Sequence, residues 1–142
     1  MDVEIRHLGP GDDDAVGAAA ELFDHPPKRD ATRRFLDEST HHLLIAYNAS
    51  GEPVGFVTGV ETTHPDKGTE MFLYELGVAE AARRRGVGST LVRTLAALAR
   101  QRGCYGMWVG TEDDNVAAHR TYERAGGQAT PAQVILEWDL RG

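Results

Sequence analysis

The chain has 142 residues and a net charge of −7, from 15 Lys plus Arg against 22 Asp plus Glu, and its length predicts a single domain over residues 1–142. The acidic balance argues against binding to nucleic acid, which needs an extended basic surface, and it fits a cationic partner. One cysteine, no apolar run long enough to span a membrane and no secretion signal together predict a cytoplasmic protein without disulfides or membrane contact.

The first half of the chain alternates between strand-like and helix-like patterns. Alternating apolar and polar residues open the sequence, and Gly9-Pro10-Gly11 then breaks the chain before an acidic residue that can cap a helix. The elements predicted here are a strand at residues 3–8, a helix from Asp12 or Asp13 to about Phe23, a short helix at 31–38 and strands at 43–47, 54–60 and 71–78. Turn sequences separate the last three, so we expect three consecutive antiparallel strands.

The second half contains the clearest helix. From Gly86 to Arg102 the apolar residues recur at helical spacing, and Gly103 follows as a stop. The remaining predicted elements are a strand at residues 105–109, a helix at 115–125 and a closing strand at 134–140. The order β-α-α-β-β-β-α-β-α-β predicts a mixed α/β sheet with helices packed on its faces.

The densest chemical signal is the run Arg83-Arg84-Arg85-Gly86-Val87-Gly88, which opens the clearest helix. A helix N-terminus presents unpaired N–H groups and a partial positive charge, and glycines let a phosphate approach the backbone. The run is neither a Walker loop, which needs a lysine after its last glycine, nor a dinucleotide fingerprint, which needs a third glycine at Leu91. We therefore expect a pyrophosphate site here. A basic turn that only caps the helix is the alternative.

Two motifs resemble those of the GNAT superfamily of N-acetyltransferases. Arg83-x-x-Gly86-x-Gly88 follows the strand ending Glu75-Leu76-Gly77-Val78, and Asn115-x-x-Ala118-x-x-x-Tyr122-x-x-x-Gly126 comes at the expected distance behind it. The resemblance implies acetyl-CoA as cosubstrate, no metal, and a central, mostly antiparallel twisted sheet whose fourth and fifth strands splay apart around the pantetheine arm. The cofactor-binding residues that it implies are Leu76, Gly77, Val78, Arg83, Arg84, Arg85, Gly86, Val87, Gly88, Ser89, Asn115, Ala118 and Tyr122.

Acetyl transfer needs a base for the amine, a polarised carbonyl and an acid for the departing thiolate. Glu75 lies among apolar residues, which favours a raised proton affinity, and we interpret it as the base; a buried ion pair with an arginine is the alternative. By resemblance, the backbone N–H of Val78 polarises the thioester carbonyl beside a bulge at Gly77, and Tyr122 protonates the thiolate unless it is a core aromatic residue. Cys104 has no base nearby in sequence, so direct attack in a ternary complex is favoured over an acetyl-cysteine.

The strand Leu73-Tyr74-Glu75-Leu76-Gly77-Val78 and the arginine run are most similar to aminoglycoside 3-N-acetyltransferases of this superfamily. That resemblance implies a small cationic amine as partner, acetylated on its 3-amino group, and a role in antibiotic resistance. A protein, peptide or polyamine acceptor and a non-catalytic acetyl-CoA-binding sensor are the alternatives. The expected acceptor-binding residues are His25, Tyr74, Glu75, Glu112, Asp113, Asp114, Glu137 and Asp139, of which the last two share one face of the closing strand.

Two further expectations concern the surface. The histidines at positions 41, 42, 64 and 119 show no metal-ligand spacing, so we expect them on the surface or in loops. By analogy with the superfamily, Ile135, Leu136 and Trp138 of the closing strand offer an apolar surface for a possible homodimer. The same three residues could instead belong to the core.

Overall fold

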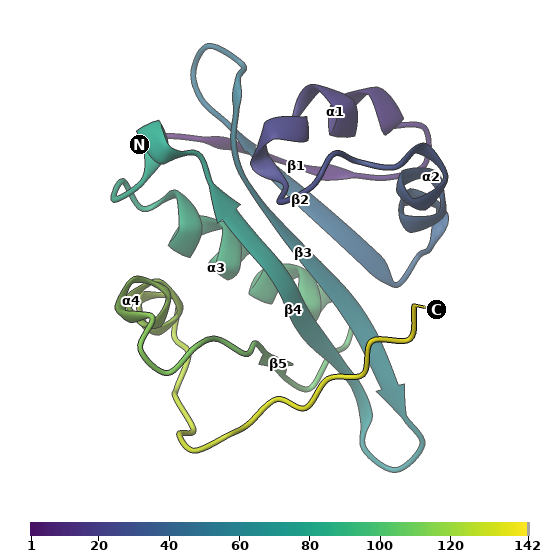
Figure 1. The fold of residues 1–142 in the computed structure, drawn as a ribbon, viewed down its shortest axis with the longest axis vertical. Helices are drawn as coiled ribbons and strands as arrows, with labels where there is room; N and C mark the ends of the chain where they lie inside the picture. Colours follow the sequence, from purple (N-terminus) through teal and green to yellow (C-terminus); the bar gives the residue numbers. More distant parts are fainter. Residues whose placement is uncertain (142) are drawn as a thin grey trace.

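The structure is a computed structural model that describes residues 1–141. It contains a five-stranded sheet with α1 and α2 against one face and α3 against the other (Figure 1). The elements in chain order are β1 (Glu4–Leu8), α1 (Asp13–Ala18), the 3₁₀ turn η1 (Ala20–Leu22), α2 (Arg29–Asp37), β2 (His41–Tyr47), β3 (Pro53–His64), β4 (Gly68–Val78), the 3₁₀ turn η2 (Glu80–Ala82), α3 (Val87–Gln101), β5 (Met107–Trp108) and α4 (Val116–Arg124).

The sheet has the order β1-β2-β3-β4-β5. Its first four strands pair antiparallel, whereas β5 lies parallel to β4 and pairs with it only at Met71↔Met107 and Phe72↔Trp108. This mixed sheet with flanking helices confirms the predicted fold class and the three antiparallel strands in the middle of the chain. Because the pairing of β4 and β5 ends at Phe72, the two strands are free to diverge toward Val78.

The core lies on both faces of β2 and β3, because alternate residues of a strand point to opposite sides. Leu43 and Ile45 pack toward α1 and α2, while Leu44 and Ala46 pack toward α3. The approach of α3 to the sheet is close: a Cβ added to Gly59 of β3 would lie 2.9 Å from Leu95 of α3. A buried helix and a small residue in the strand beneath it therefore fix the position of α3.

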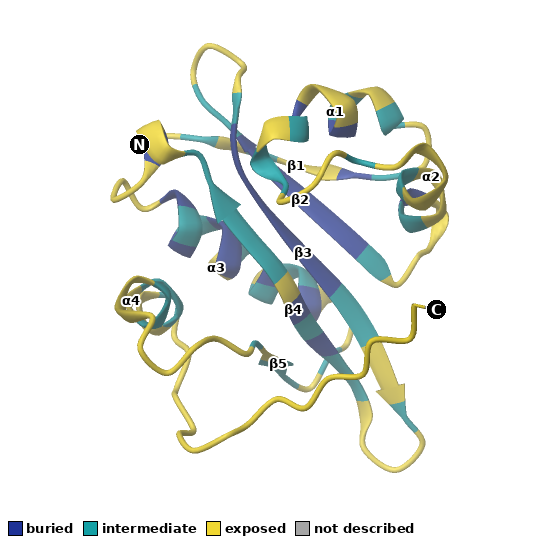
Figure 2. Ribbon diagram, in the orientation of Figure 1, coloured by how far each residue is buried: buried dark blue, intermediate teal, exposed yellow. Residues whose placement is uncertain are grey.

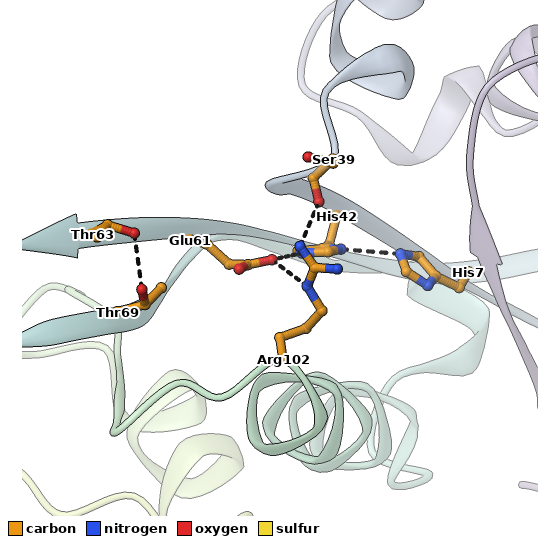
Figure 3. A network of polar contacts seen from close by, with 7 residues as sticks. All are labelled: His7, Ser39, His42, Glu61, Thr63, Thr69 and Arg102. Atoms are coloured by element: carbon orange, nitrogen blue, oxygen red, sulfur yellow. Dashed lines mark hydrogen bonds and ion pairs between the residues drawn. The ribbon is translucent and has the colours of Figure 1, made fainter.

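A polar network around the buried His42 ties three strands to the end of α3 (Figure 3). His42 Nε2 donates to the carboxylate of Glu61 at 2.6 Å, Arg102 Nε donates to the same oxygen at 2.7 Å, and His7 Nε2 lies 3.1 Å from His42 Nδ1. Burial raises the pKa of Glu61, but the hydrogen bonds from His42 and Arg102 outweigh it and hold that pKa below its usual value. The expectation that His42 lies on the surface is wrong, since only 3% of this residue is exposed.

The predicted closing strand at residues 134–140 does not form. Along the described part of the chain no strand pairs with this segment, and a strand is stable only where a neighbour satisfies its backbone N–H and C=O groups. Figure 2 shows the segment exposed over its whole length, and five of its large apolar side chains are 71–89% exposed. The other predicted elements are present with shifted ends; the first helix, for example, stops at Ala18 and continues only as the 3₁₀ turn η1.

Candidate active site

A large cleft opens where β4 and β5 diverge, with a volume of about 1940 Å³. Its walls come from the second half of β4, the N-terminus of α3, the helix α4 and the segment 17–24 that contains η1. The cleft therefore joins the predicted phosphate turn, the predicted base and the second predicted motif in one continuous space.

The turn before α3 is shaped for an anion. Gly86 is the N-cap residue and has a left-handed φ of +82°, which a residue with a side chain adopts only with strain. Its carbonyl accepts hydrogen bonds from the backbone N–H of Thr90 at 3.0 Å and from the hydroxyls of Thr90 and Ser89. The N–H groups of Val87, Gly88 and Ser89 precede the first helical hydrogen bond, so they have no acceptor within the helix and can bind a phosphate.

The second glycine of the turn has a packing role. A Cβ added to Gly88 would lie 3.1 Å from Thr121 Cγ2 of α4, closer than ordinary van der Waals contact. Gly88 therefore allows the N-terminus of α3 to approach α4, the helix that carries Tyr122. In this way the first motif sets the position of the second.

The backbone of β4 presents donors to the cleft. Ala79 N–H donates to the carbonyl of Val54 in β3 at 2.8 Å, so by alternation the backbone groups of Val78 and Leu76 point away from β3, toward the space between β4 and β5. The guanidinium of Arg83 donates to the Val78 carbonyl at 3.2 Å, which leaves the Val78 N–H to face a ligand. This arrangement fits the role that the sequence resemblance implies for that N–H.

The bulge in β4 lies at Tyr74, and the prediction of a bulge at Gly77 is wrong. Thr58 pairs with Glu75 and Gly59 with Leu73, so Tyr74 is the additional residue, whereas Gly77 pairs regularly with Phe56. The reason for a glycine at position 77 is space, because a Cβ there would lie 2.6 Å from the Phe56 ring.

Glu75 has the electrostatic surroundings of a general base. Burial raises the pKa of Glu75, the nearby charge of Asp24 raises it further, and a hydrogen bond involving Thr58 partly opposes both. The residues that shift its pKa thus include no arginine, and the ion-pair interpretation of Glu75 gains no support. A carboxylate with raised proton affinity at the edge of a cleft is suited to accept a proton near neutral pH.

Tyr122 and the start of α4 form the wall facing the turn. Burial raises the pKa of Tyr122, so the phenol keeps its proton at neutral pH and can donate it. The Oδ1 atom of Asn115 accepts from the N–H of Ala118 at 3.0 Å, so Asn115 caps the helix. The amide NH₂ of Asn115 is not used by this cap and can donate to a ligand. Asn115, Ala118 and Tyr122 all line the cleft.

The cleft gathers most of the predicted cofactor-binding residues and fewer of the predicted acceptor-binding ones. The predicted residues among its lining are Tyr74, Glu75, Leu76, Gly77, Val78, Arg83, Arg84, Gly86, Val87, Gly88, Ser89, Asn115, Ala118 and Tyr122. His25 lines a smaller pocket of about 280 Å³ beside η1. Arg85, Glu112, Asp113, Asp114, Glu137 and Asp139 are exposed and do not line the cleft.

Sequence analysis missed charged residues on both sides of the cleft. Glu21 and Asp24, from η1 and the loop after it, join Glu75, whereas Arg120 and Arg124 of α4 join the arginines before α3. The two arginines of α4 are four residues apart and so share one helix face, a spacing that could have been noticed. No local signal marks Glu21 and Asp24, because only the fold brings their loop to the cleft.

Other candidate chemistry receives no support. Burial raises the pKa of the Cys104 thiol, which disfavours the thiolate that a nucleophile needs. Within residues 1–141 no group of three or more His, Cys, Asp and Glu side chains is arranged to hold a metal ion. None of the helices in the same range combines the length and the apolar character needed to cross a membrane.

The curated relatives that this chain matches are longer proteins. Mycothiol acetyltransferases from Mycobacterium avium (strain 104) and Mycolicibacterium paratuberculosis (strain ATCC BAA-968 / K-10) are each 36% identical to this chain over 134 residues, which is 94% of this chain and 36% of each relative. This chain thus spans about a third of the length of these relatives.

Several solved structures share the fold. An aminoglycoside acetyltransferase from an uncultured soil metagenomic sample, in complex with sisomicin, has a TM-score of 0.88 at 16% identity over 98% of this chain and 97% of its own. AAC(6′)-Iy with a bisubstrate analogue of coenzyme A has a TM-score of 0.81 at 20% identity over 98% and 99%. The aminoglycoside 6′-N-acetyltransferase AAC(6′)-Ih of Acinetobacter baumannii has a TM-score of 0.76 at 16% identity over 99% and 100%.

Identities this low show the fold alone, whereas the family follows from the sequence. The model of the acetyltransferase (GNAT) family matches residues 12–127, which include both motifs, the β4 strand and the whole cleft wall from α3 to α4. The chain therefore belongs to the acetyltransferase (GNAT) family.

Proposed function

We propose that this chain transfers an acetyl group from acetyl-CoA to a primary amine, by direct attack in a ternary complex. The observation that carries the proposal is the lining of one cleft by Glu75, with raised pKa, by Tyr122, which keeps its proton, and by the N-terminus of α3. These groups supply a base, an acid and a phosphate site for one reaction.

In the proposed reaction Glu75 accepts a proton from the ammonium group, directly or through a water, so that the neutral amine can attack. A bond then forms between the amine nitrogen and the thioester carbon, and the Val78 N–H stabilises the charge on the oxygen. As the carbon–sulfur bond breaks, Tyr122 gives its proton to the sulfur. The attacking nitrogen carries two hydrogens after the attack and loses one of them to solvent, so the products are an amide and coenzyme A. Glu75 then releases its proton to solvent and Tyr122 takes one up, which restores both side chains.

The acidic residues of the cleft support a cationic acceptor. Glu21, Asp24 and Glu75 line it, with Asp24 close enough to Glu75 for its charge to act on that carboxyl, and fixed negative charges attract polycations and raise their association rate. Solved relatives with this fold include aminoglycoside acetyltransferases, one of them bound to sisomicin. We therefore propose an aminoglycoside or a similar amino sugar as acceptor. The resemblance of the β4 motif favours the 3-amino position, while two of the solved relatives are named for the 6′ position.

A second candidate acceptor comes from the curated relatives. Identity of 36% over 94% of this chain is higher than that to the aminoglycoside acetyltransferases described above, and both of these relatives are mycothiol acetyltransferases. The amine that those enzymes acetylate therefore belongs in any search for the substrate. A sensor that binds acetyl-CoA without turnover is the non-catalytic alternative.

The experiment that separates these candidates is a mass-spectrometric acetylation assay. Purified protein is incubated with acetyl-CoA and with aminoglycosides that carry or lack a 6′-amine, the mycothiol-type amine, spermine, or N-terminal peptides. Acetylation of a sugar without a 6′-amine, located by NMR at its 3-amino group, would support the first proposal in full. Acetylation only where a 6′-amine is present would overturn the 3-amino position, and turnover of only the mycothiol-type amine or only peptides would replace the aminoglycoside. Acetyl-CoA binding without any turnover would favour the sensor.

The role of Glu75 has its own test. We expect Glu75→Gln to lower kcat by about 10²-fold or more, the usual scale of general-base catalysis, and to change acetyl-CoA affinity little. Glu70→Gln is the matched control, since Glu70 lies on the same strand, outside the cleft, where it binds His64 and Tyr105. Equal rates for the two variants would remove Glu75 from the mechanism.

A further inference from the structure

Three aromatic side chains form a row across β4 and β5. The ring centroids of Trp108 and Phe72 lie 4.4 Å apart, and those of Phe72 and Tyr74 lie 5.6 Å apart. Phe72 pairs with Trp108 across the two strands, and Tyr74 is the additional residue of the bulge, so the row runs from β5 to the bulge. We call these three residues the aromatic shelf.

The shelf is exposed although most of β4 is covered. Tyr74 is 65% exposed and Trp108 is 51% exposed, whereas most other residues of β4 are buried or half-buried. Phe72 faces away from α3, because its neighbours Met71 and Leu73 pack toward that helix. Aromatic side chains carry a large apolar surface, and a cluster of them left in water beside a cleft is typical of a binding surface.

The bulge joins the shelf to the proposed base. In a regular strand the side chains of Tyr74 and Glu75 would point to opposite faces of the sheet. The bulge breaks this alternation, so the two successive side chains both lie on the face turned away from α3, and both line the cleft. The shelf therefore begins beside the carboxylate that we propose as the base and continues along the sheet to Trp108.

The charges beside the shelf indicate what kind of molecule it binds. Glu75 follows Tyr74 in the strand, and the charge of Asp24 acts on the Glu75 carboxyl. Carboxylates attract ammonium groups, whereas the negative face of an aromatic ring attracts weakly positive C–H groups or a cation. An amino sugar carries ammonium groups on a ring with an apolar C–H face, so it satisfies both kinds of group. A linear polyamine supplies the charge but has no ring face for a row of aromatic side chains.

We propose that the aromatic shelf binds the apolar face of a sugar ring of the acceptor and so brings an amine of that molecule to Glu75. This inference rests on the proposed acetyl transfer, and it makes Tyr74 and Trp108 the residues that select ring-containing amines over linear ones. Phe72 contacts both outer rings and holds them in one row. Only Tyr74 was among the expected acceptor-binding residues, and Trp108 extends the acceptor surface beyond the lining of the cleft.

The fluorescence of Trp108 gives the first test. The chain has two tryptophans, so Trp138→Leu leaves Trp108 as the single indole. This variant is saturated with coenzyme A, so that no transfer occurs, and titrated with kanamycin or with spermine. The two carry the same number of amines, but only kanamycin has sugar rings. We expect kanamycin to change the Trp108 emission in a saturable way and spermine to change it little. Equal responses to both, or no response to kanamycin, would overturn the proposal.

A second measurement separates ring recognition from a structural role of the shelf. Tyr74→Leu and Trp108→Leu each keep an apolar side chain and remove one aromatic face. We expect each to weaken kanamycin binding about three- to tenfold by calorimetry and to leave spermine binding unchanged. Trp138→Leu is the matched control, because it removes an exposed tryptophan outside the shelf. Trp108 also pairs with Phe72 across the strands, so Tyr74→Leu carries the test if Trp108→Leu unfolds. Unchanged kanamycin affinity in Tyr74→Leu, or an equal loss for spermine, would overturn the proposal.

The shelf and the proposed transfer can fail separately. Kanamycin that changes the Trp108 emission but is not acetylated when acetyl-CoA is supplied would support the shelf and contradict the transfer to this class of acceptor. Kanamycin that is acetylated with the same KM by the native chain, Tyr74→Leu and Trp108→Leu would support the transfer and overturn the shelf.

Discussion

Replacing Gly77 by alanine should destabilise the protein by overpacking. The new methyl group would lie 2.6 Å from Phe56 Cε1 and 3.3 Å from the Leu22 carbonyl, whereas carbon atoms at optimal contact are about 3.5–4.0 Å apart. The ring cannot move easily, because Phe56 is 3% exposed and its centroid lies 4.5 Å from that of Phe23. An added methyl group in a well-packed core lowers the free energy of unfolding by about 1–3 kcal/mol.

That cost is large enough to measure by thermal unfolding. At this chain length about 1 kcal/mol corresponds to roughly 4 °C of Tm, so we expect a fall of about 4–12 °C followed by circular dichroism. Gly17→Ala is the matched control: a Cβ at Gly17 meets nothing within 4 Å, and alanine favours the helix α1, so Tm should hold or rise. If Gly77→Ala melts within 1 °C of the native chain, the contact with Phe56 does not restrict position 77.

Three further predictions concern the cleft and the network around His42. Gly86→Ala places a side chain at a φ of +82°, which should lower the free energy of unfolding by about 1–2 kcal/mol. The same change should weaken coenzyme A binding several-fold in a calorimetric titration, and an unchanged affinity would contradict the phosphate site. Asp24→Asn should lower the pKa of Glu75, which its charge raises, so the acid limb of the kcat/KM profile should move to lower pH, and a limb that stays in place would refute the coupling. Burial, and then the charges of His42 and Arg102, lower the pKa of His7. Below about pH 6.5 the unfolded chain therefore binds a proton that the folded chain does not, so the free energy of unfolding should decrease as the pH falls. His7→Gln should flatten this loss of Tm between pH 7 and 5; an identical slope would exclude His7 as its source.

The elements that the sequence predicts correctly are those determined by nearby residues. The helix at 86–102 was predicted nearly to its ends, because its apolar residues recur at helical spacing and a glycine follows it. The glycine turn before this helix was located for the same reason, since the motif and the helix that it opens are adjacent; its role in binding a phosphate stays a prediction. Local spacing is therefore enough to predict most of the residues that line the cleft around the N-terminus of α3.

The features that the sequence did not predict depend on distant residues. His42 was expected at the surface, but its partners Glu61 and Arg102 are 19 and 60 positions away, and only the packing of β3 and α3 brings them together. The strand at 134–140 was predicted from alternation, which reports an amphipathic face and not a neighbour to pair with. Glu21 and Asp24 reach the cleft through the path of a loop, for which no periodic pattern exists.

The bulge in β4 explains how a strand that belongs to the core also supplies the proposed base. Met71 and Leu73 pack toward α3, so in a regular strand the side chain of residue 75 would point to the same buried face. The additional residue Tyr74 reverses this alternation, and Leu76 takes the position toward α3 instead. Glu75 is thereby turned to the opposite face, where burial and then the charge of Asp24 raise its pKa. This reversal can be read in the sequence, because the apolar residues that face α3 lie at odd positions, 71 and 73, before the bulge and at even positions, 76 and 78, after it. A one-residue break in strand alternation, followed by a glycine turn that opens a helix, is therefore a sequence signal for a carboxylate turned away from the buried face of its strand.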